Sequence, residues 1–171
     1  MTQSNAEEMS RPESNGNGTP EDDLKVHDEL SVTHHSVVIG GEEIAYTATA
    51  GTLVQKEEDG TPKASFFFTA YTRDSASNDE EDLPVASRPI TFAFNGGPGS
   101  SSVWLHLGLL GPRRVEMAGE EGRLPPPPYR LVDNAASLLD VSDLVFIDPV
   151  STGYSRATRE EEAKEFHAFQ K

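Results

Sequence analysis

The stretch Asn95-Gly96-Gly97-Pro98-Gly99-Ser100-Ser101-Ser102 decides the fold of this chain. A strand-forming run, Ile90-Thr91-Phe92-Ala93-Phe94, precedes it, and a second apolar run, Val103-Trp104-Leu105-His106-Leu107, follows it. This order predicts a strand, a glycine loop and a helix. Glycines let such a loop approach a ligand closely, and a helix start offers unpaired N–H groups. We therefore expect the stretch to cradle an anion, or the oxyanion that forms when a carbonyl is attacked.

A tight turn without chemistry is the plainest alternative, because glycine and proline also mark ordinary connections between strands and helices. In α/β-hydrolases, however, the loop after the third strand supplies one N–H of the oxyanion hole, often through a His-Gly-Gly-Gly type of motif. Asn95 stands where the histidine of that motif would be. The loop alone leaves both interpretations open.

Two motifs in a fixed order carry a family resemblance. The stretch Asn95–Ser102 resembles the Asn-Gly-Gly-Pro-Gly-Cys/Ser-Ser-Ser signature of serine carboxypeptidases. The end of a second block, 143–155, is similar to that family's Asp-Pro-Val-Gly-Thr-Gly-Tyr-Ser segment. Gly111-Pro112 and Asp133-Asn134 also fall between the motifs as they do in the family. The resemblance implies an α/β fold of the α/β-hydrolase type, with a central mixed sheet and flanking helices.

The composition limits the classes of partner. A chain of 171 residues allows one domain or part of a larger one. It has no cysteine, so it can form neither disulfides nor a thiolate metal site. Secreted eukaryotic serine carboxypeptidases carry disulfides, so the resemblance indicates a bacterial-type relative. The net charge of −15 disfavours nucleic acid and anionic membrane surfaces as partners.

The ends of the chain differ from its middle. Residues 1–30 are rich in Glu, Asp, Ser, Asn, Gly and Pro, and are predicted to be a disordered acidic tail. Because the first 23 residues lack the features of a signal peptide, we expect a cytoplasmic protein. No apolar run is long enough to span a membrane. Residues 31–171 are assigned to the N-terminal part of the hydrolase domain.

The first half of this domain is predicted to be antiparallel. Ser36–Ile39 and Glu42–Gln55 form a hairpin around the turn Gly40-Gly41. Further predicted elements are a strand at Ala64–Thr72, an acidic loop at Arg73–Ser87 and the strand Pro89–Phe94. Antiparallel strands before the first strand-to-helix crossover suit the opening of an α/β-hydrolase sheet. His34-His35 is predicted to be a surface pair, because no further metal ligands occur at matching spacing.

The helix after the glycine loop is predicted to be amphipathic. One helical stripe holds four residues assigned to the core, which are Val103, Trp104, Leu107 and Leu110. His106 lies off this stripe, where it could line a cleft, but we do not assign it to catalysis. The polyproline segment Leu124–Tyr129 is expected to shape the rim of the site rather than to serve as a ligand for a partner domain.

Three further elements are predicted near the second motif. Asn134 is expected to cap a short helix that runs through Leu139. Leu144–Asp148 is predicted to be a strand buried on both faces, as parallel strands are. A last helix is expected from Thr158 to Lys171, with Thr158 as its cap and three glutamates in its first turn.

The nucleophile of an α/β-hydrolase is a serine on a Gly-x-Ser-x-Gly elbow directly after a strand. Gly153-Tyr154-Ser155-Arg156-Ala157 fits a relaxed form of this pattern. Pro149 ends the preceding strand, however, and Val150-Ser151-Thr152 separates that strand from the serine. We therefore predict that Ser155 is not the nucleophile. The resemblance implies that the nucleophilic serine, the aspartate and the histidine lie beyond Lys171, so the chain alone is predicted to be inactive.

The resemblance assigns roles to three residues of the glycine loop. It makes Gly97 the N–H donor of the oxyanion hole, and Asn95 and Gly96 ligands of the substrate's terminal carboxylate. The chain also departs from the family pattern at four positions. Ala93 replaces a tryptophan and Leu109 replaces a glutamate of the carboxylate-binding network, while Ser100 replaces a cysteine and Ser151 a glycine.

Three functions remain open at this point. The first is a serine-type carboxypeptidase that releases C-terminal residues from peptides through an acyl-enzyme. The second is an acyltransferase or esterase on the same scaffold, favoured by Ala93 and Leu109. The third is a non-catalytic remnant or binding module. For the first, the expected partner is a peptide with a free C-terminus, and neither a metal nor a cofactor is expected.

Overall fold

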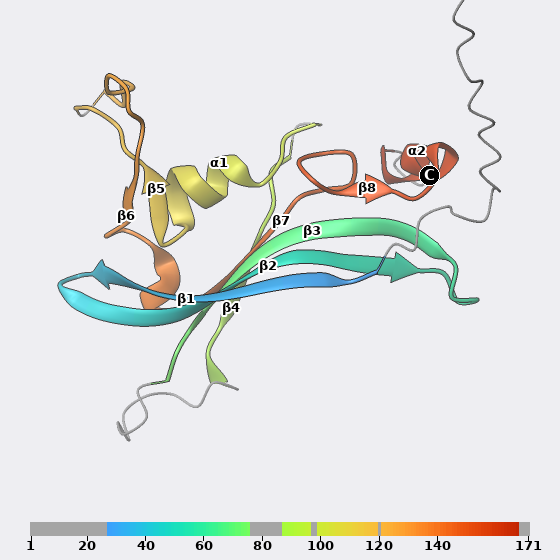
Figure 1. Ribbon diagram of the computed structural model, residues 1–171, viewed down its shortest axis with the longest axis horizontal. Coiled ribbons are helices and arrows are strands. Elements are labelled where there is room, and N and C mark those ends of the chain that lie inside the picture. The colour runs from blue at the N-terminus through green and yellow to red at the C-terminus, as the bar shows by residue number, and fades with distance from the viewer. Residues whose placement is uncertain (1–26, 76–86, 97–98, 120, 168–171) are drawn as a thin grey trace, which may run out of the picture.

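The computed structural model describes residues 27–75, 87–96, 99–119 and 121–167. It is a mixed α/β structure built on one twisted sheet with the strand order β1-β2-β3-β7-β4 (Figure 1). The strands of this sheet are β1 (Glu29–Ile39), β2 (Glu42–Lys56), β3 (Pro62–Arg73), β4 (Ile90–Ala93) and β7 (Asp143–Ile147), and β8 (Arg156–Ala157) pairs with β3. The strands β5 (Arg113–Val115) and β6 (Leu131–Asp133) form a separate pair.

The predicted antiparallel opening is confirmed. The turn between β1 and β2 is Gly40-Gly41, with φ angles of 61° and 89° that glycine adopts without steric cost. The two strands pair without a break from Ile39↔Glu42 to Glu29↔Thr52. Strand β1 thus begins at Glu29, so the predicted tail of residues 1–30 extends two residues too far. Residues 1–26 and 76–86, which hold most of that tail and the centre of the acidic loop, lie outside the described residues.

The sheet becomes mixed at its other side. Strand β7 pairs antiparallel with β3 and parallel with β4, as an α/β crossover requires. The chain between β4 and β7 runs through α1 (Val103–Leu105), the π-helical turn η3 (His106–Leu110), the β5–β6 pair and the 3-10 helix η4 (Leu138–Asp140). These segments lie on the same side of the sheet as α2 (Glu160–His167) (Figure 1).

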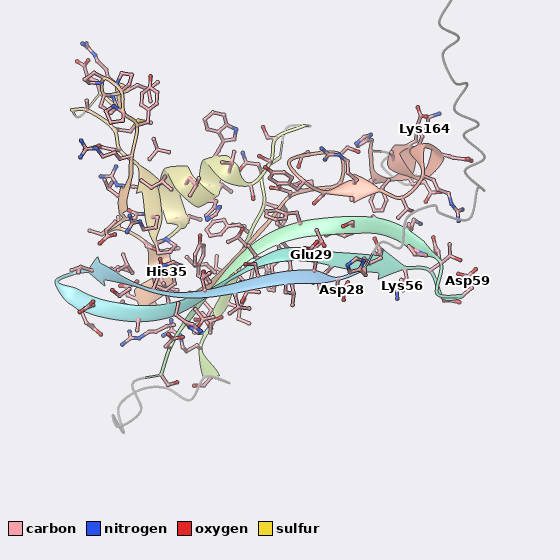
Figure 2. The ribbon with its side chains drawn as sticks, in the orientation of Figure 1. Asp28, Glu29, His35, Lys56, Asp59 and Lys164 are labelled. Atoms are coloured by element: carbon pink, nitrogen blue, oxygen red, sulfur yellow. The ribbon has the colours of Figure 1, made fainter. Side chains whose placement is uncertain are left out.

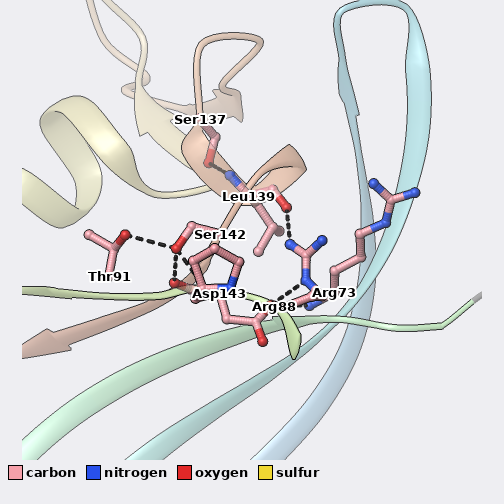
Figure 3. Close-up of polar contacts among 8 residues, drawn as sticks. Arg73, Arg88, Thr91, Ser137, Leu139, Ser142 and Asp143 are labelled. Atoms are coloured by element: carbon pink, nitrogen blue, oxygen red, sulfur yellow. Dashed lines mark hydrogen bonds and ion pairs between the residues drawn. The ribbon is translucent and has the colours of Figure 1, made fainter. Parts of the chain in front are cut away.

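An ion pair fixes the start of the parallel pair. Arg88 Nε lies 3.1 Å from Asp143 Oδ1, and the Arg88 guanidinium also donates to the Leu139 carbonyl at 3.0 Å (Figure 3). Asp143 Oδ1 accepts a further bond from the Arg73 N–H. The contact joins the chain before β4 to the start of β7 and to η4, so it sets which ends of the two strands lie together.

The core occupies only one face of the sheet. Its buried side chains come from all five main strands and from η4, and they are Val37, Ile39, Ile44, Tyr46, Tyr71, Ala93, Leu139, Leu144 and Phe146. The opposite face is apolar but open, with a shallow groove of about 450 Å³ lined in part by Phe66, Phe68, Phe92, Val145 and Ile147. The prediction that β7 is buried on both faces is therefore wrong for Val145 and Ile147, which are half-buried.

The helix after the glycine loop departs from the predicted stripe. Trp104 and Val103 are 70% and 43% exposed, whereas Leu110 packs against the core. Only Val103–Leu105 is α-helical, and a π-helical turn follows, closed by the bond from the Gly111 N–H to the His106 carbonyl. A π turn holds more residues than an α turn, so it changes which side chains face the sheet. The core assignment of Val103 and Trp104 is therefore wrong.

Asn134 does not cap a helix. Its side-chain amide is buried and donates to the carbonyls of Leu109 and Gly111, each at 2.8 Å. The cap of η4 is Ser137, whose side chain accepts from the Leu139 N–H. The predicted short helix is thus the three-residue η4. Asn134 instead ties the turn before η4 to the end of η3.

The last helix is tied to the β2–β3 end of the sheet. Lys63 Nζ lies 2.9 Å from Glu57 and 3.0 Å from Glu165 of α2, and these carboxylates raise the pKa of Lys63. The Thr158 hydroxyl also donates to the carbonyl of Lys63. Asp59 in the β2–β3 turn and Lys164 on α2 consequently lie at the same end of the molecule (Figure 2). Among the residues that the structure describes, none belongs to a helix long and apolar enough to cross a membrane.

Candidate functional site

A cleft of about 530 Å³ lies between the two sequence motifs. One wall comes from the glycine loop and contains Asn95, Gly96, Gly99 and Ser100. The other wall is the segment 149–152 of the second motif, and Phe66, Phe166 and His167 complete the lining. The structure thus brings Asn95 and Gly96 together with the second motif. Gly97, the expected oxyanion donor, lies outside the described residues, as does Pro98.

The glycine loop needs its conformational freedom at Gly99. This residue has a φ of 97°, which side chains of L-residues rarely adopt. The helical segment that follows is short, because α1 has three residues before the π-helical turn begins. A helix this short offers few aligned N–H groups, so it contributes little to an anion site. The wall of the cleft is formed by the loop itself.

Asp148 connects the two motifs from behind the cleft. Its side chain is almost fully buried, and Oδ1 accepts from both the N–H and the hydroxyl of Ser102, each at 2.8 Å. Its second oxygen, Oδ2, accepts from the Tyr154 N–H at 3.2 Å. One carboxylate therefore binds the end of the glycine loop and the end of the second motif.

Gly153 is required where the second motif passes Asp148. A Cβ added to Gly153 would lie 1.7 Å from Asp148 Oδ2, and its φ of 48° is itself unfavourable for other residues. Because Gly153 has no side chain, its backbone can come close to the carboxylate, and the Tyr154 N–H reaches Asp148 Oδ2. This close approach gives a physical reason for glycine at this position of the motif.

Ser155 has a structural role in this chain. It is completely buried, and its hydroxyl donates to the Asp148 carbonyl at 2.6 Å and accepts from the Phe67 N–H at 2.8 Å. These bonds link the second motif to β3. A nucleophile must expose its oxygen to the substrate, so the burial of Ser155 agrees with the prediction that it is not the nucleophile.

His106 lies on η3 and packs against the sheet. Its ring stacks on Phe146 with centroids 4.7 Å apart, and its Nε2 is hydrogen-bonded to the Tyr71 hydroxyl. Burial lowers the pKa of His106 to about 4, although the charge of Asp148 opposes this shift. Burial also raises the pKa of Tyr71. Both side chains are therefore neutral near pH 7 and hold η3 against the sheet.

Two departures from the family pattern can be placed in the structure. Ala93 is buried in the core at the end of β4, where the family has a tryptophan. Leu109 is 58% exposed on η3, where the family has a glutamate. Neither residue offers a polar side chain for a carboxylate-binding network.

The histidine pair on β1 is exposed, as predicted. His34 Nδ1 is hydrogen-bonded to the Thr47 hydroxyl, and His35 Nε2 to the Thr33 hydroxyl. Within the described part of the chain, no group of three or more His, Asp or Glu side chains could hold a metal ion.

Sequence reasoning missed the roles of Asp148 and Ser102, although it quoted both within motifs. A usable signal was present, since Asp148 directly follows the apolar strand β7. A carboxylate at the end of a buried strand must find hydrogen-bond donors, because burying an unpaired charge is costly. What the sequence did not reveal was the identity of the donor, which lies 46 residues earlier.

Comparisons with known proteins agree with the two motifs. The model of the family described as serine carboxypeptidase matches residues 44–169. Pheromone-processing carboxypeptidase KEX1 of Saccharomyces cerevisiae strain S288c is 33% identical over 109 residues, which are 63% of this chain and 13% of that protein. The protein of the same name from Debaryomyces hansenii is 33% identical over 91 residues, or 53% of this chain and 11% of that protein. Both relatives come from yeasts, so the expectation of a bacterial-type chain stays a prediction. With the family model matched over most of its length, the chain belongs to the serine carboxypeptidase family.

Proposed function

We propose that this chain is the substrate-loop portion of a serine-type carboxypeptidase, which releases C-terminal residues from peptides through an acyl-enzyme. The observation that carries the proposal is the cleft between the two family motifs, where Asn95 and Gly96 face the segment 149–152. A peptide end bound there would lie beside the loop that the family resemblance assigns to substrate binding. Family membership supports the reaction class.

The proposed roles follow the geometry of acyl transfer. The Gly97 N–H would donate to the carbonyl oxygen of the scissile bond, and this hydrogen bond strengthens as that oxygen becomes negative. Asn95 and Gly96 would bind the terminal carboxylate of the peptide. Such contacts orient the scissile bond toward the nucleophile and so favour release of the last residue.

The nucleophile and its partners are proposed to lie in sequence that follows Lys171. The burial of Ser155 and its two hydrogen bonds support this assignment, because they leave its hydroxyl engaged on both sides. The chain also spans only 13% of the S. cerevisiae relative that it matches. We therefore propose that the 171-residue chain alone hydrolyses neither peptides nor esters.

A serine-directed phosphonate probe tests this proposal. The complete protein that contains these residues should be labelled stoichiometrically, at a serine outside residues 1–171 and with loss of carboxypeptidase activity. The 171-residue chain should remain unlabelled. Mass spectrometry that located the label on Ser155 would contradict the assignment. A complete protein that neither reacts nor hydrolyses peptides would instead favour a binding module.

A second candidate is an esterase or acyltransferase with the same oxyanion loop. The specific observation in its favour is that Ala93 and Leu109 replace the tryptophan and glutamate of the family's carboxylate-binding network. A site with a weakened preference for a free carboxylate would accept esters and C-terminally blocked peptides about as well as peptides with a free C-terminus. Comparing kcat/KM for a peptide and its C-terminal amide separates the two candidates.

A further inference from the structure

We propose that Asp148 is the positioning residue of the substrate cleft, and that it holds both walls through Ser102 and Tyr154. This inference rests on the proposed carboxypeptidase function and adds a residue to its machinery. Asp148 itself is not among the residues that line the cleft. It acts through the two segments that it binds.

The backbone of Asp148 is fixed before its side chain makes any contact. The residue follows β7 directly, and its N–H donates to the Phe67 carbonyl of β3 at 3.0 Å. Its own carbonyl accepts from the Ser155 hydroxyl at 2.6 Å. The carboxylate therefore projects from the centre of the sheet, which suits a group that must position two loops.

The hydrogen bonds of this carboxylate are strong because of its burial. Asp148 is only 4% exposed, and three donors among the described residues reach its oxygens, namely the Ser102 N–H, the Ser102 hydroxyl and the Tyr154 N–H. Hydrogen bonds to an ionised acceptor are shorter and stronger than neutral ones. A buried carboxylate that lost them would be left partly unpaired, so any movement of Ser102 or Tyr154 is resisted.

The two donors stand at the ends of the two cleft walls. Ser102 follows Ser100, the last lining residue of the glycine loop, by two positions. Tyr154 follows Thr152, the last lining residue of the opposite wall, by two positions. A single carboxylate between them holds Ser100 and the opposite wall at a fixed distance. Gly153 also approaches Asp148 Oδ2 closely, so that no side chain fits between the carboxylate and this wall.

Asp148→Asn in the complete protein tests the role with little change in shape. Asn keeps one acceptor for Ser102, but its NH2 group would meet the Tyr154 N–H, donor against donor. We expect KM for peptides with a free C-terminus to rise roughly tenfold, and kcat per titrated active site to fall by up to about a hundredfold. Ser102→Ala, which removes one of the three bonds, should show a smaller change in the same direction. Asn95→Ala provides the reference for loss of a direct substrate contact.

Ser142→Ala is the matched control, because this serine is also buried and hydrogen-bonded to a backbone carbonyl, but it lies at the opposite end of β7 from Asp148. It should lower the melting temperature and leave KM and kcat per active site unchanged. KM does not depend on the amount of folded enzyme. Comparing Asp148→Asn with this control therefore separates an effect on substrate positioning from an effect on protein stability. The proposal is overturned if Asp148→Asn leaves both constants unchanged, or if Ser142→Ala reproduces its effect.

Amide hydrogen exchange makes the outcome independent of the proposed function. In Asp148→Asn, the segment 99–106 should exchange at least about tenfold faster than in the wild type, while β2 and β3 keep their protection. If the wild-type protein hydrolysed no peptide, the proposed carboxypeptidase function would fail, and exchange would still decide whether Asp148 holds the loop. Unchanged exchange in this segment would refute the positioning role.

Discussion

Ser151 occupies the left-handed region of backbone space, with a φ of 71°, in one wall of the cleft. This conformation costs a residue with a Cβ about 1–2 kcal/mol, and it costs glycine almost nothing. The Ser151 N–H donates to the Ser155 carbonyl at 3.1 Å, so the surrounding loop holds the residue in this state. The family's glycine at this position therefore has a conformational reason, and the serine of this chain carries the strain.

Ser151→Gly should stabilise the protein. Relief of the left-handed strain exceeds the added entropy of the unfolded chain, so we expect the free energy of unfolding to rise by about 0.5–1 kcal/mol. Urea denaturation of the complete protein measures the change. Ser151→Ala keeps the Cβ and should bring no gain. Gly153→Ala should act in the opposite direction, because its Cβ would clash with Asp148. A gain in Ser151→Ala equal to that of the glycine variant would show that φ is not the cause.

At the level of elements, the five main strands of the sheet could be predicted, whereas the short strands β5, β6 and β8 and the helix after the glycine loop could not. The β-forming residues and the Gly40-Gly41 turn are local signals, and they predicted the turn and the pairing of the two strands correctly. They missed the first half of β1, which begins at Glu29 and not at Ser36. The stripe Val103–Leu110 assumed the α-helical period over its whole length. The π-helical turn breaks that period, and its last carbonyls, those of Leu109 and Leu110, accept from the distant side chains of Asn134 and Ser137. Such distant hydrogen bonds leave no local pattern in the sequence.

The packing of η3 on the sheet should depend on pH through His106. Burial lowers its pKa from 6.5 to about 4, so the unfolded chain binds more protons than the folded one between these values. The contribution of neutral His106 is therefore complete above about pH 6.5 and is lost as the pH falls toward 4. The pKa difference corresponds to about 3 kcal/mol at most, and to less where the ring remains partly exposed to solvent.

His106→Gln isolates this contribution, because glutamine can still hydrogen-bond Tyr71 but does not titrate. Between pH 7 and pH 4, the wild-type protein should lose more unfolding free energy than the variant, by up to about 3 kcal/mol. Denaturant titrations of both complete proteins at several pH values measure the difference. Titrating carboxylates contribute equally to the unfolding free energy of both proteins, so their effect cancels in this comparison. Parallel pH profiles would mean that His106 keeps an ordinary pKa.

For the whole molecule, the sequence predicted the class of fold and the order of the main strands. The family resemblance that the two motifs carry was sufficient to expect the α/β-hydrolase type, and Asn95 and Gly96 do line a cleft. The contacts that fix the arrangement were not predictable, since Arg88 with Asp143 and Ser102 with Asp148 join residues 55 and 46 positions apart. Ionic and hydrogen-bond partners at such separations follow from the completed sheet rather than from spacing in the sequence.

The face of the sheet opposite the core is largely exposed. Residues from β2, β3, β4 and β7 form an apolar groove there, while α1, η3 and η4 lie on the other side (Figure 1). Helix α2 meets the groove through Phe166, whose ring packs against Phe66. An exposed apolar area of this kind marks a surface that another element covers. Because α/β sheets are packed on both faces, we expect further segments of the complete family domain to cover this groove.

Phe92→Ser tests this expectation, since Phe92 lies on β4 in the groove and is 59% exposed. In the 171-residue chain, the substitution should reduce binding of a fluorescent apolar dye, because it removes exposed apolar surface. In the complete protein, the same substitution should cost about 2–4 kcal/mol of unfolding free energy, since Phe92 would be buried there. Leu124→Ser, on the β5–β6 loop and 63% exposed, is the matched control and should change the stability of the complete protein by less than about 0.5 kcal/mol. An equally small effect of Phe92→Ser in the complete protein would show that the groove stays open, and that the sheet of this family member is covered on one face only.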